Sequence, residues 1–136
     1  MVMTLAFLYS VVHCYRICYE ALDQCSYCTD ERAVCETNSI RDLVPRNLST
    51  NLRHLEIKFT GASSALEAHM FNRYRKLESI SITGNVTCVT QKAFGHLQHL
   101  KNLSILHTKL QTFEAEVFHP KPVLEHLQLN NNKFTT

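Results

Sequence analysis

The stretch Leu77–Asn85, L-E-S-I-S-I-T-G-N, decides the fold of this chain, because its apolar pattern recurs at a nearly constant interval. A leucine leads, isoleucines follow three and five residues later, and an asparagine ends the stretch. Similar stretches begin at Leu52, Leu100 and Leu124, so the four leading leucines are 25, 23 and 24 residues apart (77−52, 100−77, 124−100). Self-similarity at such a period predicts a chain built from stacked structural repeats.

The centre of each repeat alternates apolar and polar residues, as in I-S-I at residues 80–82, which predicts a short, half-buried β-strand. One such strand cannot cover its own apolar side, so we expect the repeats to stack into a parallel sheet with one continuous core. Asn85 and Asn132 are expected to turn inward and to bind backbone groups left open by the turn. Thr60 and Thr108 take this position in the other two repeats, and a hydroxyl predicts a weaker ladder there.

The return limb, which leads the chain back to the next strand, carries a second recurrence. Phenylalanines follow short helix-compatible runs at residues 66–70, 91–93 and 114–117; they are Phe71, Phe94 and Phe118. Stacked on the convex side, they would close the core. Nothing polar converges on them, so we expect no cofactor site there.

These repeats resemble those of extracellular leucine-rich-repeat proteins, such as Toll-type receptors and hormone-receptor ectodomains. The resemblance covers the chain from about Cys18 to its last residue. It implies an α/β fold: a right-handed solenoid with a short parallel sheet on its concave side, behind a disulfide-stapled amino-terminal cap. It also implies protein recognition without catalysis, in the amino-terminal part of a secreted or receptor protein.

The start of the chain is similar to a secretory leader. Residues 1–12, MVMTLAFLYSVV, form an apolar run too short to span a bilayer, although no Lys or Arg precedes it. A buried first strand or helix of the domain is the alternative. We assign residues 1–17 to a signal peptide.

The cap is expected at residues 18–51, because the passage from Cys35 to Leu52 resembles the family's link into the first repeat. A cap covers the apolar surface and the open sheet edge of the first repeat, and one this small needs covalent staples. The repeats would occupy 52–136, as 52–76, 77–99, 100–123 and an incomplete 124–136, whose core we expect to be exposed.

The clustered cysteines allow three interpretations: structural disulfides, a zinc site, or a redox C-x-x-C at residues 25–28. The family's interleaved pattern implies the pairs Cys18–Cys28 and Cys25–Cys35. The zinc site would use the same four sulfurs, in an intracellular zinc-binding structural or regulatory protein, but only one close pair is present. Cys88 is left over after the second strand, as a half-buried free thiol or a partner for Cys14.

Composition and motifs exclude several classes of function. A net charge of +2 over 136 residues gives no support for a nucleic-acid partner, and the length allows one domain. The chain has no phosphate-binding glycine loop and no G-x-S-x-G motif. His96-x-x-His99 has no third ligand at metal-binding spacing, so a solvated surface is expected. We therefore expect no enzyme, no metal and no cofactor.

Three sequons occur, at Asn47, Asn85 and Asn102. We expect glycans at Asn47, in the link from cap to repeat, and at Asn102, on the concave side of a strand. We expect none at Asn85, because that side chain should point inward.

The concave face is the expected binding surface for a protein ligand or co-receptor. The outward strand positions are His54, Glu56, Lys58, Ser79, Ser81, Thr83, Asn102, Ser104, Leu106, His126, Gln128 and Asn130. They include no Trp, Tyr or Arg, the residues that dominate tight interfaces, so a solvated sheet face is the alternative. We expect the protein to be secreted or held outside the plasma membrane, with membrane attachment only if the chain continues beyond residue 136.

Overall fold

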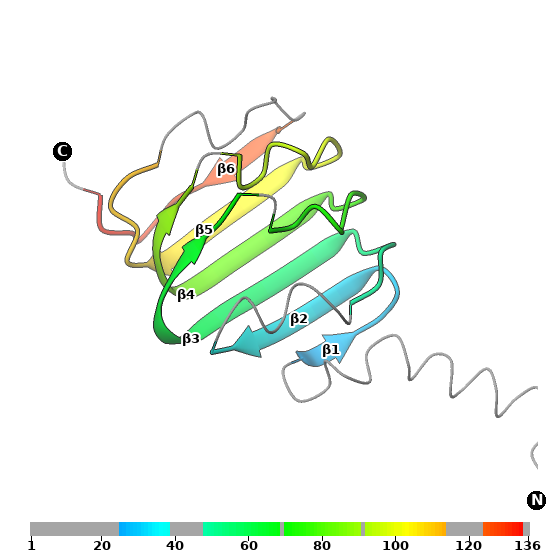
Figure 1. Ribbon diagram of the computed structural model, residues 1–136, viewed down its shortest axis with the longest axis horizontal. Coiled ribbons are helices and arrows are strands. Elements are labelled where there is room, and N and C mark those ends of the chain that lie inside the picture. The colour runs from blue at the N-terminus through cyan, green and yellow to red at the C-terminus, as the bar shows by residue number, and fades with distance from the viewer. Residues whose placement is uncertain (1–24, 39–47, 69, 91, 114–123, 135–136) are drawn as a thin grey trace, which may run out of the picture.

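A single curved sheet dominates the computed structural model, which describes residues 25–38, 48–68, 70–90, 92–113 and 124–134 (Figure 1). Within these residues the sheet has six strands in chain order. They are β1 (Cys25–Cys28), β2 (Arg32–Thr37), β3 (His54–Leu66), β4 (Ser79–Val89), β5 (Asn102–Thr108) and β6 (His126–Gln128).

The strand register follows the spacing of the leading leucines. All pairs from β2 to β6 are parallel, and His54 lies opposite Ser79, Ser79 opposite Asn102, and Asn102 opposite His126. Each repeat therefore adds one strand to the sheet. The predicted solenoid is confirmed.

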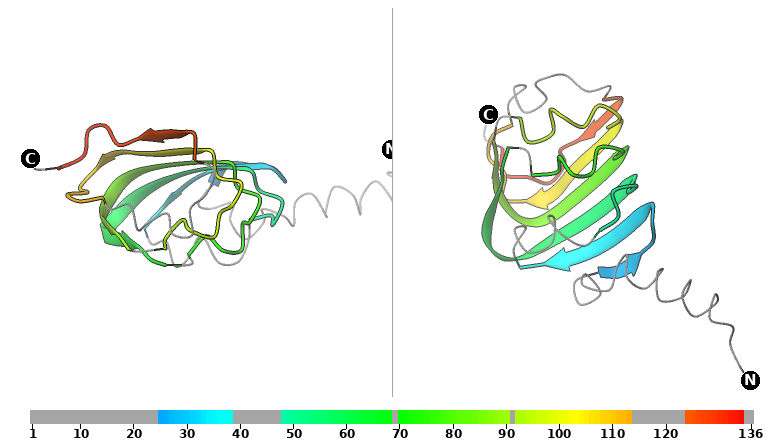
Figure 2. Two further views of the ribbon diagram at one scale, coloured as in Figure 1. Left: turned by 90° about the horizontal axis from the view of Figure 1, so that it is seen from above. Right: turned by 45° about the vertical axis from the view of Figure 1, so that its right-hand side comes forward.

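The core lies between the sheet and the return limbs. Ile80 is 1% exposed and Leu103 is fully buried, as the predicted register requires. Phe71 and Phe94 stack behind the sheet with ring centroids 5.6 Å apart and an interplanar angle of 13°. Figure 2 shows the strands on one side of the molecule and the return limbs on the other. Phe118 lies outside the described residues.

After Phe71 and Phe94 the described return limbs consist of consecutive turns, whereas the helix-compatible runs before the phenylalanines lie partly or wholly outside the described residues. The N–H of Tyr74 donates to the carbonyl of Phe71 at 2.9 Å, and that of Leu77 to the carbonyl of Tyr74 at 3.1 Å. Leu97 and Leu100 repeat this pattern in the next limb. The physical reason is the spacing of the buried residues, every third residue, which fits turns closed by i→i+3 bonds.

The predicted asparagine ladder is present. The Nδ2 of Asn85 donates to the carbonyl of Gly61 at 2.6 Å, and that of Asn132 donates to the carbonyl of Ile105 at 2.8 Å. Thr108 is buried at the same position. Thr60 is exposed there, and its Oγ1 lies 3.4 Å from the carbonyl oxygen of Thr37 and 3.0 Å from Oδ1 of Asn38.

The cap joins the sheet directly. β2 pairs with β3 in the same parallel register, and Ala33 and Cys35 point into the core beside Leu55 and Ile57. β1 runs antiparallel to β2 and covers its outer edge. The parallel sheet thus begins within the cap.

The structure contains a Cys25–Cys35 disulfide, one of the two bridges that the resemblance implies. Cys28 is also disulfide-bonded, and Cys18 lies outside the described residues. A zinc site at these positions would need thiolates, which the bridged sulfurs do not provide. Cys88 is a free thiol, but it lies within β4 and is exposed, whereas we expected a half-buried position in a loop.

The last repeat covers its apolar residues poorly, as expected from its length: Leu127 of β6 is 42% exposed. In the part of the chain that the structure describes, no helix has the length and apolar character needed to cross a membrane.

Candidate functional site

The face of the sheet that points away from the core is the candidate site, and we call it the concave face. Successive strand residues alternate between faces, so the residues between the outward positions of β3, β4 and β5 are buried, as at Leu55, Ile80 and Leu103. Eleven of the twelve predicted positions lie on the strands of this sheet: β3 supplies three, β4 three, β5 three and β6 two. The twelfth, Asn130, lies in the turn after β6.

The parallel register arranges these side chains into rows that cross the repeats. The first row contains His54, Ser79, Asn102 and His126. The second contains Glu56, Ser81, Ser104 and Gln128, and the third Lys58, Thr83 and Leu106. The Oγ of Ser104 donates to Oε1 of Gln128 at 3.0 Å, which links β5 to β6 on this face.

The cap extends each row by one residue that the sequence analysis missed. Arg32 precedes His54, Val34 precedes Glu56, and Glu36 precedes Lys58 in the register of β2 with β3. The signal was present in R-A-V-C-E-T, residues 32–37, whose alternation matches that of the repeats.

Tyr27 extends the second row once more. It lies opposite Val34 in the pairing of β1 with β2, so both side chains belong to the same face of the sheet. Tyr27 is 51% exposed and Val34 is half-buried. The absence of Tyr and Arg from the expected surface therefore holds for the four repeats but not for the whole concave face, because the cap adds both residue types.

The chemistry of the concave face changes along the solenoid. At the cap end the side chains are large, charged or aromatic, and they are exposed: Tyr27, Arg32, Glu36, His54, Glu56 and Lys58. On β4 they are small and half-buried, as at Ser79 and Ser81. A shallow hollow of about 160 Å³ lies where these two zones meet. It is lined by Arg32, Ala33, His54, Leu55, Glu56, Ser79 and Ser81.

The remaining predicted sites lie elsewhere or are not described. His96 and His99 are exposed on the second return limb, away from the concave face. Among the described residues no group of three or more His, Cys, Asp or Glu side chains is arranged to hold a metal ion. Asn102 is half-buried in the first row of the concave face, and Asn47 lies outside the described residues.

Comparison with known families agrees with the geometry. The family model described as leucine rich repeat matches residues 85–134, which include β5 and β6. No curated protein matches the chain.

Proposed function

The chain is a leucine-rich-repeat protein, and we propose that it is an extracellular, non-catalytic recognition module that binds a protein ligand or co-receptor on its concave face. Leucine-rich-repeat domains generally mediate binding between proteins. The parallel strands support this role because they hold alternate side chains of successive repeats in fixed rows.

The main support for the proposal comes from the side chains that begin the second row, in the cap. Tyr27 presents an exposed aromatic ring beside the apolar side chain of Val34, with Arg32 two residues away on the same strand as Val34. Tyr and Arg are enriched among the residues that dominate binding energy, and charged and polar residues around them suit an interface rim. We therefore place the centre of the interface on β1 and β2, with β3 at its border.

The extracellular location is supported by the cap chemistry. Cys25, Cys28 and Cys35 are all in disulfides, and disulfides persist in oxidising compartments. The apolar run at residues 1–12 fits the same route. Expression of the chain with its own amino terminus in cultured eukaryotic cells tests this part. Oxidised protein in the medium is expected, and retention of reduced protein in the cytosol would contradict it.

The binding role is tested with a displayed library of secreted and cell-surface proteins, followed by affinity measurements on purified variants. For a partner found this way, Tyr27→Ala should weaken binding about tenfold or more, the size of a typical hot-spot loss. Phe134→Ala is the matched control, because Phe134 is 43% exposed, similar to Tyr27, but lies outside the concave face. A partner that loses affinity equally with both variants would not bind at the proposed centre.

A second variant tests the concave face as a whole. Glu56→Lys, Lys58→Glu, Ser81→Arg and Ser104→Arg together reverse two exposed charges and add bulk at two half-buried positions of the second row. Circular dichroism and thermal unfolding confirm that the variant is folded. Unchanged affinity in the folded variant would place the interface on the loops or the convex side.

A further inference from the structure

The outer surface of the return limbs carries a set of polar side chains that the proposed protein interface does not use. In the first limb Phe71, Tyr74 and Leu77 are fully buried, so the residues between them form the outside of the two turns. The second limb repeats this arrangement with Phe94, Leu97 and Leu100 inside. The outer residues are Asn72, Arg73, Arg75 and Lys76 in the first limb, and His96, Gln98 and His99 in the second.

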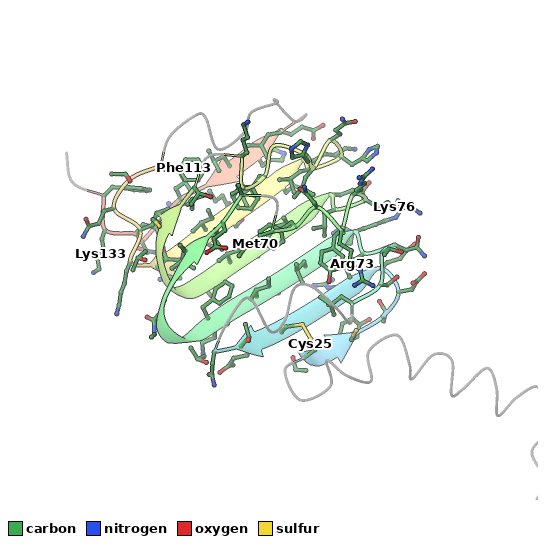
Figure 3. The ribbon with its side chains drawn as sticks, viewed as in Figure 1. Cys25, Met70, Arg73, Lys76, Phe113 and Lys133 are labelled. Atoms are coloured by element: carbon green, nitrogen blue, oxygen red, sulfur yellow. A yellow bond between two sulfur atoms is a disulfide. The ribbon has the colours of Figure 1, made fainter. Side chains whose placement is uncertain are left out.

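A hollow of about 290 Å³ lies between these two limbs and is lined by Asn72, Arg75, His96, Gln98 and His99. We call it the limb hollow. Its lining combines one guanidinium, two imidazoles and two amides, and no carboxylate of the described residues belongs to it. Arg73 and Lys76 lie on the same side of the molecule, opposite Lys133 (Figure 3).

Glu78 is the acidic residue nearest to Arg75 in the sequence, and it forms an ion pair outside the limb hollow. Glu78 Oε1 lies 3.8 Å from Nη1 of Arg53, on the neighbouring strand edge. Lys76 Nζ donates to Oδ1 of Asn51 at 2.7 Å, which directs that ammonium group toward the cap. Arg75 is therefore the charged side chain among the described residues that line the limb hollow, and the two imidazoles add N–H donors.

We propose that the limb hollow binds a sulfated sugar unit of an anionic glycan. A guanidinium group matches the oxygens of an oxyanion with two parallel N–H donors, and imidazole N–H groups add further donors. Amide side chains both donate and accept, which suits sugar hydroxyls. Among the described residues no aromatic hydrocarbon or aliphatic side chain lines the hollow, so it does not offer the apolar lining that holds peptide side chains or drug-like ligands.

The size of the hollow agrees with this ligand class. Its volume lies just below the range of about 300–1,000 Å³ found for small-molecule sites, which fits one unit of a longer chain. The proposal is independent of the concave face, because its residues belong to the return limbs.

The test uses the whole chain and a heparin-derived octasaccharide, with affinity measured by calorimetry in the presence of EDTA. The variant Arg75→Gln/His96→Gln/His99→Gln removes the guanidinium and both imidazoles of the limb hollow and keeps polar side chains on exposed turns. We expect at least a tenfold loss of affinity. The desulfated octasaccharide should not bind the wild-type protein.

The matched control removes three lysines from elsewhere on the surface, as Lys92→Gln/Lys109→Gln/Lys133→Gln, all exposed positions. It lowers the formal charge by more than the first variant does, so diffuse charge attraction would weaken more in the control. The proposal requires the control to bind within about twofold of wild type, and Tyr27→Ala likewise. Absence of octasaccharide binding by wild type, equal losses in the two triple variants, or equal binding of the desulfated chain would each overturn it.

Discussion

Asn132 binds Thr108 across two neighbouring repeats, with its Oδ1 2.6 Å from Oγ1 and 3.1 Å from the backbone nitrogen of Thr108. The same amide donates from Nδ2 to the carbonyls of Ile105 and Leu129, at 2.8 and 2.9 Å. One side chain thus forms hydrogen bonds with backbone groups of its own turn and of the preceding repeat. The stacking of repeats depends on such polar links as well as on apolar burial.

Replacing Asn132 by Ala should lower the free energy of unfolding by about 1–3 kcal/mol, because half-buried backbone groups lose their partners. Asn130→Ala is the control, since its side chain is exposed and should change stability by less than about 0.5 kcal/mol. Urea denaturation of both variants gives the comparison. Equal stability of the two variants would show that the ladder at Asn132 contributes little.

A left-handed backbone position recurs in three successive repeats. Gly84, His107 and Asn131 have φ angles of 97°, 53° and 57°. A Cβ on Gly84 would also collide with the carbonyl oxygen of Phe59. His107→Gly should therefore stabilise the protein by up to about 1 kcal/mol, because glycine adopts positive φ without steric cost. Gly84→Ala should destabilise it by more than that. Thermal unfolding of the pair should move the midpoints in opposite directions, and a loss of stability in His107→Gly would contradict this reasoning.

Tyr74 should make the free energy of unfolding of the protein depend on pH in the alkaline range. Burial raises the pKa of its phenol, against smaller opposite effects of Arg73 and of a hydrogen bond with the backbone of Leu48. Since the folded pKa lies above the unfolded value of about 10, this group's contribution is complete below about pH 10 and is lost as pH rises through the folded pKa.

The Tyr74→Phe variant checks this contribution. It should lose less stability than the parent as the pH is raised from about 9 to about 11, the range that brackets the ordinary pKa of a phenol. Both proteins carry Cys88→Ser, because an exposed thiolate would exchange with the disulfides at high pH. Urea denaturation at each pH measures the difference. Parallel stability curves would show that the Tyr74 phenol ionises equally well in the folded state.

The repeat pattern was sufficient to predict the sheet, its register and most of the core, because burial on one side of a stacked strand leaves few alternatives for positions such as Ile80 and Leu103. It was not sufficient for the return limbs. The turns after Phe71 and Phe94 were not predicted, because the alternation of the strands does not extend to a limb in which every third residue, as at Phe71, Tyr74 and Leu77, is held in the core.

The candidate site was predicted only where the repeats supply it. Arg32 and Val34 share the alternation of the repeats, but their strand lacks the leading leucine by which the repeats were recognised. Tyr27 could not be placed from periodicity, because β1 is antiparallel and its pairing with β2 contains a bulge between Cys25 and Tyr27. The residue at the centre of the proposed interface was thus the hardest to find in the sequence.

Alkylation of the unreduced protein should label Cys88 and leave Cys25, Cys28 and Cys35 unlabelled, because Cys88 is an exposed free thiol and the others are in disulfides. Peptide mapping by mass spectrometry reads each site separately. Reduction before alkylation, the control, should expose all four. Labelling of Cys25 or Cys35 without reductant, or release of zinc when they are labelled, would favour the zinc-binding alternative instead.

The last prediction concerns N-glycosylation at Asn85 and Asn102, the two sequon asparagines that the structure describes. Asn85 is half-buried, and its Nδ2 lies 2.6 Å from the carbonyl oxygen of Gly61, so a sugar on that nitrogen would have to displace a contact between repeats. Asn102 is also half-buried, but it lies in the first row of the concave face and not at the turn that holds Asn85. In protein secreted by eukaryotic cells we expect occupancy at Asn102 and none at Asn85.

Glycopeptide mapping measures both, and Thr87→Ala, which removes the Asn85 sequon, should leave the glycan mass of the secreted protein unchanged. A glycan on Asn85 in folded protein would contradict the inward position of this side chain, and a glycan on Asn102 would confine partner binding to the cap end of the concave face.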